Sequence, residues 1–420
     1  MDAYLLGAGF SKAMHPAMPT LYELGPQIIK ALKKSGPLRR NENPLAPFND
    51  DVETWLSHLA ISEPWNTEDT DFRNRELFVR ASQEINEYIN KTTPGWDQLS
   101  EASQNNLLRL VHHWSLDRSP ILTFNYDLIV EQAVTKRVRE CPPYPGRPID
   151  PDRLIDFYAL PLTFRRISSA FLSGGKATDD IPTLYKLHGS VNWKYSGPEA
   201  PYAPVVLQEP QDSPSGYPYI YDDLSPLIIP PTSSKSAFYN NHALRAQWRN
   251  AYKSLEKADR LVVMGYSLPQ TDLQVRTLLG MALRKDAEII VIDRSPEVTE
   301  RWKRLRHDLQ IQGIHGDDPV GDYVETHCDY LATWRATTDQ PPAGEQHLTI
   351  PGRVHETRPW NSEPSPIESA MGQLAQRWPS MEKRWVTTSN PEIGVGEWQA
   401  RMIVSRHDYQ QCPNPWDDGA

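Results

Sequence analysis

The sequence has few cysteines and no long apolar run, and each of these absences excludes a class of protein. Its three cysteines, Cys141, Cys328 and Cys412, lie far apart. They leave neither a Cys-x-x-Cys pair nor the four thiolates of a cysteine zinc site. No segment approaches the roughly 18 consecutive apolar residues of a membrane-spanning helix, and the N-terminus lacks the basic start of a secretory signal. We therefore expect a cytoplasmic protein with no metal site and no membrane span.

Positive charge is also in short supply. The 420 residues include 44 Lys and Arg against 54 Asp and Glu, giving a formal net charge of -10. Direct binding to nucleic acid is disfavoured, because Lys and Arg supply most contacts to phosphates. With 39% hydrophobic residues, the chain can bury the core of one large domain and carry an appendage.

Apolar strand-like runs alternate with helical patterns, which predicts an α/β fold with a parallel, Rossmann-like sheet. The expected strands are 2–6, 119–124, a strand leading to His188, 260–264, 288–293 and 309–314. Helical spacing of apolar residues between 20 and 116 predicts a helical insertion after the first strand. We expect residues 1–335 to form the catalytic domain and 336–420 to form a C-terminal appendage.

Two segments have unusual composition. Residues 141–231 hold 16 of the 38 prolines, which predicts mostly loops that cover a site, with one strand leading to His188. Residues 360–420 hold five of the 13 tryptophans. Aromatic residues are scarce in disordered tails, so an ordered appendage that packs on the domain or on a partner is favoured over a disordered extension.

Small or polar residues follow four of the strand-like runs. These residues are Gly7, Ala8, Gly9, Phe10 and Ser11 in the first segment, Asn125 and Asp127 in the second, His188 in the third, and Gly265 and Ser267 in the fourth. In an open parallel sheet, ligands bind beyond the carboxyl ends of the strands, where such loops converge. The four segments together therefore predict a nucleotide site.

Each segment alone has an ordinary structural interpretation. A Gly-x-Gly turn can be only a turn, and the dinucleotide fingerprint is broken because Lys12 replaces its third glycine. Asn125 and Asp127 could be helix caps. A lone histidine such as His188 can be a buried polar residue, although its pKa suits base catalysis near neutral pH. The broken fingerprint disfavours an ordinary dehydrogenase, whereas the residues alone leave the turn, the caps and the buried histidine open.

The order and the residues of the four segments resemble those of the sirtuin family, specifically its bacterial branch of sirtuin-like, NAD-consuming defence proteins. The resemblance covers roughly residues 1–320 and includes Gly-Ala-Gly-x-Ser, Asn-x-Asp, His-Gly and Gly-x-Ser-Leu. Two features depart from the sirtuin deacylases. The cysteine pairs of their zinc ribbon are missing, and Phe124 replaces their glutamine before Asn125.

The resemblance implies a role for each matching residue. Asn125 would orient the nicotinamide ribose and a water, and His188 would be the general base. The matching residues expected to bind NAD are Gly7, Ala8, Gly9, Phe10, Ser11, Asp127, Gly265 and Ser267. From its position at the end of the strand 288–293, where a carboxylate can accept from ribose hydroxyls, Asp293 is also expected to bind NAD. Asp272 could cap the helix that follows it or bond within the site, and its position favours the cap.

The sequence thus predicts an NAD glycohydrolase that releases nicotinamide and ADP-ribose, with NAD as substrate and a role as a triggered effector of antiphage defence. One alternative is an NAD-dependent protein deacylase or ADP-ribosyltransferase. Another is a non-catalytic NAD or ADP-ribose binding module of a larger assembly. The resemblance implies a homo-oligomer, or a partner that is an ATPase, an Argonaute-like protein or a phage-sensing protein.

Overall fold

The computed structural model describes residues 1–116, 118–140, 182–197, 205–207, 224–232 and 238–328, together with Tyr158, Lys235 and two strands near the C-terminus. The strands are β1 (Asp2–Leu6), β2 (Ile121–Thr123), β3 (Leu184–Lys186), β4 (Gly189–Tyr195), β5 (Val206–Leu207), β6 (Ser225–Ile228), β7 (Arg260–Met264), β8 (Glu288–Ile292), β9 (Gln310–Ile314), β10 (Gln346–Ile350) and β11 (Ala400–Val404). The α-helices are α1 (Ala8–Met14), α2 (Leu21–Ser35), α3 (Val52–Ala60), α4 (Glu68–Thr92), α5 (Glu101–Leu116), α6 (Ile129–Glu140), α7 (His242–Lys257), α8 (Leu273–Ala282), α9 (Pro296–Leu305) and α10 (Pro319–His327).

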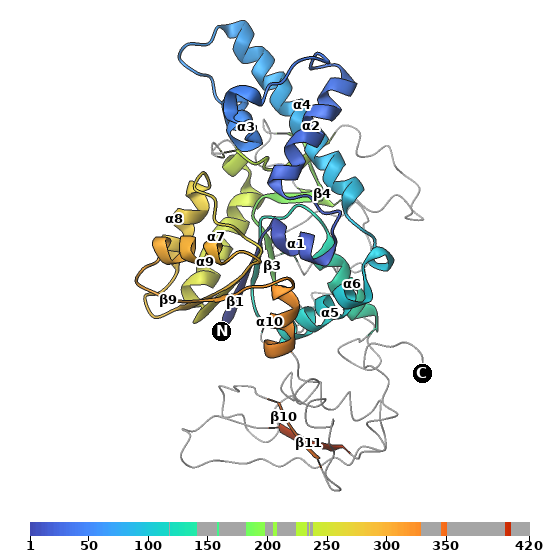
Figure 1. Cartoon of the computed structure of the whole chain (residues 1–420), viewed down its shortest axis with the longest axis vertical. Coiled ribbons are helices and arrows are strands. Elements are labelled where there is room, and N and C mark those ends of the chain that lie inside the picture. The colour runs from blue at the N-terminus through green and yellow to red at the C-terminus, as the bar shows by residue number, and fades with distance from the viewer. Residues whose placement is uncertain are drawn as a thin grey trace, which may run out of the picture.

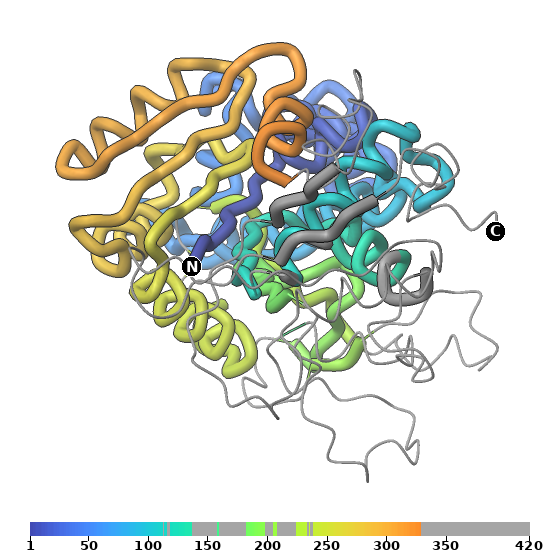
Figure 2. Tube along the Cα trace, turned by 90° about the horizontal axis from the view of Figure 1, so that it is seen from below, coloured from blue at the N-terminus to red at the C-terminus, as the bar shows by residue number. Residues whose placement is uncertain are grey.

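A six-stranded parallel sheet forms the centre of the molecule, in the order β3-β2-β1-β7-β8-β9. The predicted Rossmann-like α/β fold is therefore confirmed. Chain order reverses between β1 and β7, because β2 and β3 lie on one side of β1 and the later strands on the other (Figure 2). Such a reversal opens a crevice beyond the strand ends, which is where ligands bind in this architecture.

Helices cover both faces of the sheet, which explains why its strands are apolar runs. Side chains of β1 alternate between two cores: Tyr4 and Leu6 belong to one, and Ala3 and Leu5 to the other. Helices α5, α6 and α10 pack into the first core, and α7, α8 and α9 into the second (Figure 1). No helix in the described ranges is long and apolar enough to cross a membrane.

Helices α2, α3 and α4 lie within the range 20–116 that was predicted as a helical insertion, and they have their own core, whereas α5 of the same range packs into the first core of the sheet (Figure 1). Helix α2 begins at a capping box, in which Thr20 and Glu23 satisfy each other's backbone amides. The insertion packs on a three-stranded antiparallel sheet of order β5-β4-β6, through Val191 and Ile228. Only one strand was predicted between 141 and 231, and this was wrong, since β4, β5 and β6 also lie there.

The predicted appendage lies almost wholly outside the described residues. Within it the structure describes only β10 and β11, which pair with each other as antiparallel strands. The domain boundary near 335 and the role of the Trp-rich segment 360–420 therefore stay predictions.

Candidate active site

The loops after β1 and β7 touch at the point where the strand order reverses. The Gly7 amide donates to the Met264 carbonyl at 3.0 Å, and the Gly9 amide donates to the Gly265 carbonyl at 2.9 Å. Gly265 has a left-handed φ of 62°, and a Cβ there would lie 2.1 Å from the Phe10 nitrogen. Only glycine permits both this conformation and this approach of two backbones.

The amides of Gly7, Gly9 and Phe10 all donate to protein carbonyls, and the Phe10 amide reaches the Gly7 carbonyl at 2.9 Å. Ala8 is exposed, and Ser11 is buried. The predicted binding of phosphate by this segment is therefore an untested prediction. It requires a ligand to use the exposed backbone at Ala8 or to displace some of these contacts.

Asn125 joins the loops after β1 and β2. Its side-chain amide donates to the Gly7 carbonyl and to the Ser11 hydroxyl, each at 2.8 Å. Its own backbone amide donates to the Thr123 hydroxyl at 3.1 Å. These bonds fix the amide nitrogen on the protein, so the side-chain oxygen is the atom left for a ligand.

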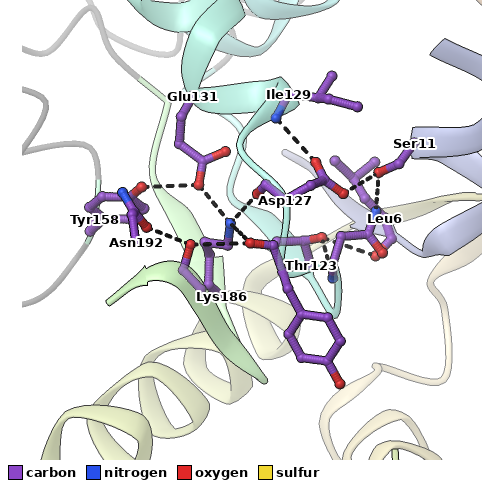
Figure 3. Close-up of polar contacts among 12 residues, drawn as sticks. Leu6, Ser11, Thr123, Asp127, Ile129, Glu131, Tyr158, Lys186 and Asn192 are labelled. Atoms are coloured by element: carbon purple, nitrogen blue, oxygen red, sulfur yellow. Dashed lines mark hydrogen bonds and ion pairs between the residues drawn. The ribbon is translucent and has the colours of Figure 1, made fainter. Parts of the chain in front are cut away.

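Asp127 completes this network from the other side. One carboxylate oxygen accepts from the Ser11 hydroxyl at 2.6 Å, and the other accepts from the Ile129 amide at 3.1 Å, at the start of α6 (Figure 3). The structure thus brings Ser11, Asn125 and Asp127 together, as the sequence predicted. Asp127 also has the helix-capping role that its position at a strand-to-helix turn allows.

His188 follows β3 and is enclosed by aromatic rings. Its ring centroid lies 4.9 Å from that of Phe124, 6.5 Å from Tyr126 and 6.3 Å from Trp248. We call Phe124, Tyr126 and Trp248 the aromatic shell. The Trp248 indole donates to the Leu187 carbonyl at 2.8 Å, which holds this ring beside the histidine.

Burial favours the neutral form of the His188 imidazole, and one of its ring nitrogens has no hydrogen-bond partner among the described residues. The residue is 6% exposed, and its Nε2 has no hydrogen-bond partner among the described residues. Burial, with a smaller effect of the Lys235 charge, lowers its pKa from 6.5 to about 3, although Asp272 opposes the shift. A buried nitrogen without a partner is costly, and such atoms are often functional.

A buried ion pair lies near His188. The Lys235 ammonium donates to the Asp272 carboxylate at 2.8 Å, and the Tyr266 hydroxyl donates to its other oxygen at 3.0 Å. Burial alone would raise the pKa of Asp272, but the electrostatic interactions with His188 and Lys235, together with these hydrogen bonds, bring it below the ordinary value. The expectation that Asp272 caps α8 was wrong, because its side chain makes no capping bond.

Two predicted NAD contacts lie on the other side of the strand reversal. Ser267 is exposed, and its carbonyl accepts from Arg301 at 3.2 Å. Asp293 is half-buried at the end of β8, where its carboxylate accepts from the Ser295 amide at 3.0 Å. Their roles remain predictions, since neither contacts Asn125 or His188 in the hydrogen bonds of the described residues.

Sequence reasoning missed two charged residues of the site, Lys186 and Lys235. Both are almost fully buried, and each pairs with a carboxylate far away in sequence, Glu131 and Asp272 respectively. A lysine inside the apolar run of β3 was a usable signal, because buried lysine is rare unless paired. No cluster of three or more potential metal ligands occurs among the described residues.

Comparison with known proteins identifies a family for the central part of the chain. The family model of the SIR2-like domain matches residues 119–314, a range that contains Asn125, His188 and Gly265 but not the first loop. A structure from work on the mechanism and regulation of Sir2 enzymes is 12% identical and covers 80% of this chain and 93% of its own, with a TM-score of 0.35. A Sir2 structure with a p53 peptide and NAD+ has the same identity and TM-score, and covers 80% of this chain and 94% of its own. No curated protein sequence matches the chain. Residues 119–314 are therefore similar to the SIR2-like domain, over a little less than half of the chain.

Proposed function

We propose that the protein is an NAD glycohydrolase that breaks the bond between nicotinamide and ribose and adds water to the ribose. The SIR2-like domain supports an NAD-using enzyme. The observation that carries the proposal is the enclosure of His188, whose free Nε2 lies within the aromatic shell. A small acceptor such as water fits this surrounding better than an acylated lysine on a peptide.

The proposed reaction needs little acid catalysis, because nicotinamide leaves as a neutral pyridine with the bonding electron pair. The ribose carbon becomes oxocarbenium-like, and fixed dipoles stabilise that charge. The side-chain oxygen of Asn125 provides such a dipole, since its amide nitrogen is held by Gly7 and Ser11. The attacking water gives its proton to His188 Nε2, which passes it to solvent and returns to the neutral form.

The proposal includes a low but measurable activity of the resting protein, which a trigger would raise, because unchecked loss of NAD would harm a cell. The contact between the Gly9 amide and the Gly265 carbonyl supports this, since the two loops expected to hold the dinucleotide are closed against each other. A role as a triggered effector of antiphage defence, within a homo-oligomer or with a partner protein, belongs to the same proposal and rests on the sequence resemblance.

Two substitutions test the assignment. We expect Asn125→Ala and His188→Ala each to lower NAD turnover about 100-fold or more, because each removes a group that acts in the transition state. Circular dichroism and gel filtration check that both variants fold. Leu273→Ala is a matched control, because Leu273 is 60% exposed on α8 and should leave turnover unchanged. Wild-type turnover by either site variant would contradict the proposal.

A further inference from the structure

Lys186 is a buried, fully hydrogen-bonded cation that belongs to none of the four sirtuin-like segments to which the sequence analysis gave a role. It is 1% exposed, on β3, and its ammonium donates to Glu131 at 2.7 Å and to the Tyr126 carbonyl at 3.3 Å. A third bond goes to the Asp127 carbonyl (Figure 3). An ammonium group has three donors, so Lys186 uses all of them on protein acceptors.

These acceptors connect the two loops that carry the proposed catalytic groups. Lys186 precedes His188 by two residues, and the carbonyls of Tyr126 and Asp127 directly follow Asn125. The Leu187 amide donates to the Thr123 carbonyl at 3.0 Å, next to the last paired residues of β2 and β3, Thr123 and Lys186. Beyond this pair, the Lys186 ammonium links the end of β3, just before His188, to the loop after Asn125. The Val191 amide also donates to the Tyr126 carbonyl, at 3.0 Å, whereas Lys186 is the donor to the Asp127 carbonyl.

Glu131 balances the buried ammonium. It is 9% exposed on α6 and also accepts from the Tyr158 hydroxyl at 3.0 Å. Burial raises the pKa of the Glu131 carboxyl, and the Lys186 charge opposes that rise. A buried ion pair of this kind is weak evidence for stability, because apolar residues of similar volume often stabilise a protein as well or better.

We propose that Lys186 is a positioning residue: it fixes the backbone of Tyr126 and Asp127 and so sets the place of Asn125 relative to His188. The inference deepens the proposed glycohydrolase and rests on it for its effect on turnover. The inference also claims that Lys186 restrains the loop 125–127, and this claim can be tested in a protein that has no turnover.

Lys186→Met tests the inference, because methionine keeps most of the volume and removes the three donors. Arg306→Met is the matched control. Arg306 is also a buried cation, and it donates to two carbonyls, Leu279 at 3.1 Å and Leu283 at 3.3 Å, and to the carboxylate of Asp308 at 2.8 Å. Its acceptors lie at the end of α8 and just before β9, and none belongs to the loops that carry the proposed catalytic groups.

Two readouts are needed. Hydrogen exchange of the peptide 121–130 should speed up at least tenfold in Lys186→Met and stay within twofold of wild type in Arg306→Met. The kcat for NAD should fall about 10- to 100-fold in Lys186→Met at a temperature well below its Tm, with KM changed less than threefold. The double variant Lys186→Met with Glu131→Leu should recover Tm and not kcat, because apolar packing replaces the ion pair but not the donors to the loop.

Unchanged exchange of the peptide 121–130 in Lys186→Met would overturn the inference, whatever the enzyme does. A kcat within threefold of wild type, or recovery of kcat together with Tm in the double variant, would also overturn it, since Lys186 would then act only through stability. Absence of turnover in the wild-type protein would instead overturn the proposed function, and the exchange result would still decide whether Lys186 restrains the loop.

Discussion

In mild acid, the free energy of unfolding should fall by an amount that follows from the difference between the pKa of His188 in the unfolded and in the folded protein. An unfolded histidine titrates near its ordinary pKa of 6.5, whereas burial lowers the folded pKa to about 3. Between these two pH values, His188 is therefore protonated in the unfolded state and neutral in the folded state. The stability contributed by the neutral imidazole is complete above pH 6.5 and is lost progressively as the pH falls from 6.5 toward 3.

The loss grows by about 1.4 kcal/mol for each pH unit below 6.5, so between pH 8 and pH 5 it reaches about 2 kcal/mol. Urea unfolding at pH 8, 7, 6 and 5 gives the free energy of unfolding for wild type and for His188→Asn, which has no titrating side chain at this position. The wild type should lose about 2 kcal/mol more than the variant over this range. Carboxylates that do not interact with His188 also respond to acid, but they are present in both proteins and cancel in the difference. Asp272 interacts with His188, so the double variant His188→Asn with Asp272→Asn, compared with Asp272→Asn alone, isolates the contribution of the histidine.

Leu279→Ala is the control for general destabilisation. Leu279 lies on α8 and is fully buried in the second core, so its truncation should lower the free energy of unfolding by about 3 kcal/mol at every pH. Its pH dependence should match that of wild type. The reasoning is refuted if His188→Asn and wild type lose the same stability between pH 8 and pH 5, because His188 would then titrate alike in the folded and unfolded states.

Three further predictions concern the site, the loop contact and the C-terminal segment. Because the His188 base stays neutral down to about pH 3, kcat/KM for NAD should stay flat from pH 8 to 5.5; a base of ordinary pKa would lose about tenfold, and that loss would contradict the assignment. Gly265→Ala should lower the free energy of unfolding in urea by about 2 kcal/mol or more, because a Cβ at this position would lie 2.1 Å from the Phe10 nitrogen. Gly280→Ala in α8 is the control: its Cβ would meet no atom within 4 Å, so the change should be neutral or stabilising. Deletion of Trp360–Ala420 should change the oligomeric mass in light scattering or the partners captured in a pull-down, because its aromatics would supply an interface; unchanged assembly and activity would reject that role.

The sequence predicted the main sheet well because β1, β2, β7 and β8 are buried along almost their whole length, whereas the edge strand β9 is largely exposed. Buried strands read as continuous apolar runs, and the predicted strand 260–264 coincides with β7. The parallel direction of the strands followed from their alternation with helices, which serve as right-handed crossovers. Parallel strands end at one edge of a sheet, and β2 and β3 are paired neighbours, so the segments that contain Asn125 and His188 both lie at this edge.

Contacts between distant segments were not predictable in the same way. Asp272 has the sequence position of a helix cap, but its carboxylate is taken by Lys235, 37 residues earlier. The pairing of Lys186 with Glu131 joins residues 55 apart. The strands β4 to β6 were missed because the segment 141–231 is rich in proline, and proline content says little about the short stretches between the prolines.

The central proposal is that this protein transfers the ADP-ribosyl group of NAD to water and releases nicotinamide. The most direct measurement incubates the purified full chain at micromolar concentration with NAD, with and without an acylated lysine peptide, and quantifies products by chromatography and mass spectrometry. The account predicts nicotinamide and ADP-ribose in equal amounts, independent of the peptide and lost in Asn125→Ala. Consumption of NAD only with the peptide, accompanied by its deacylation, or no consumption at all, would contradict it.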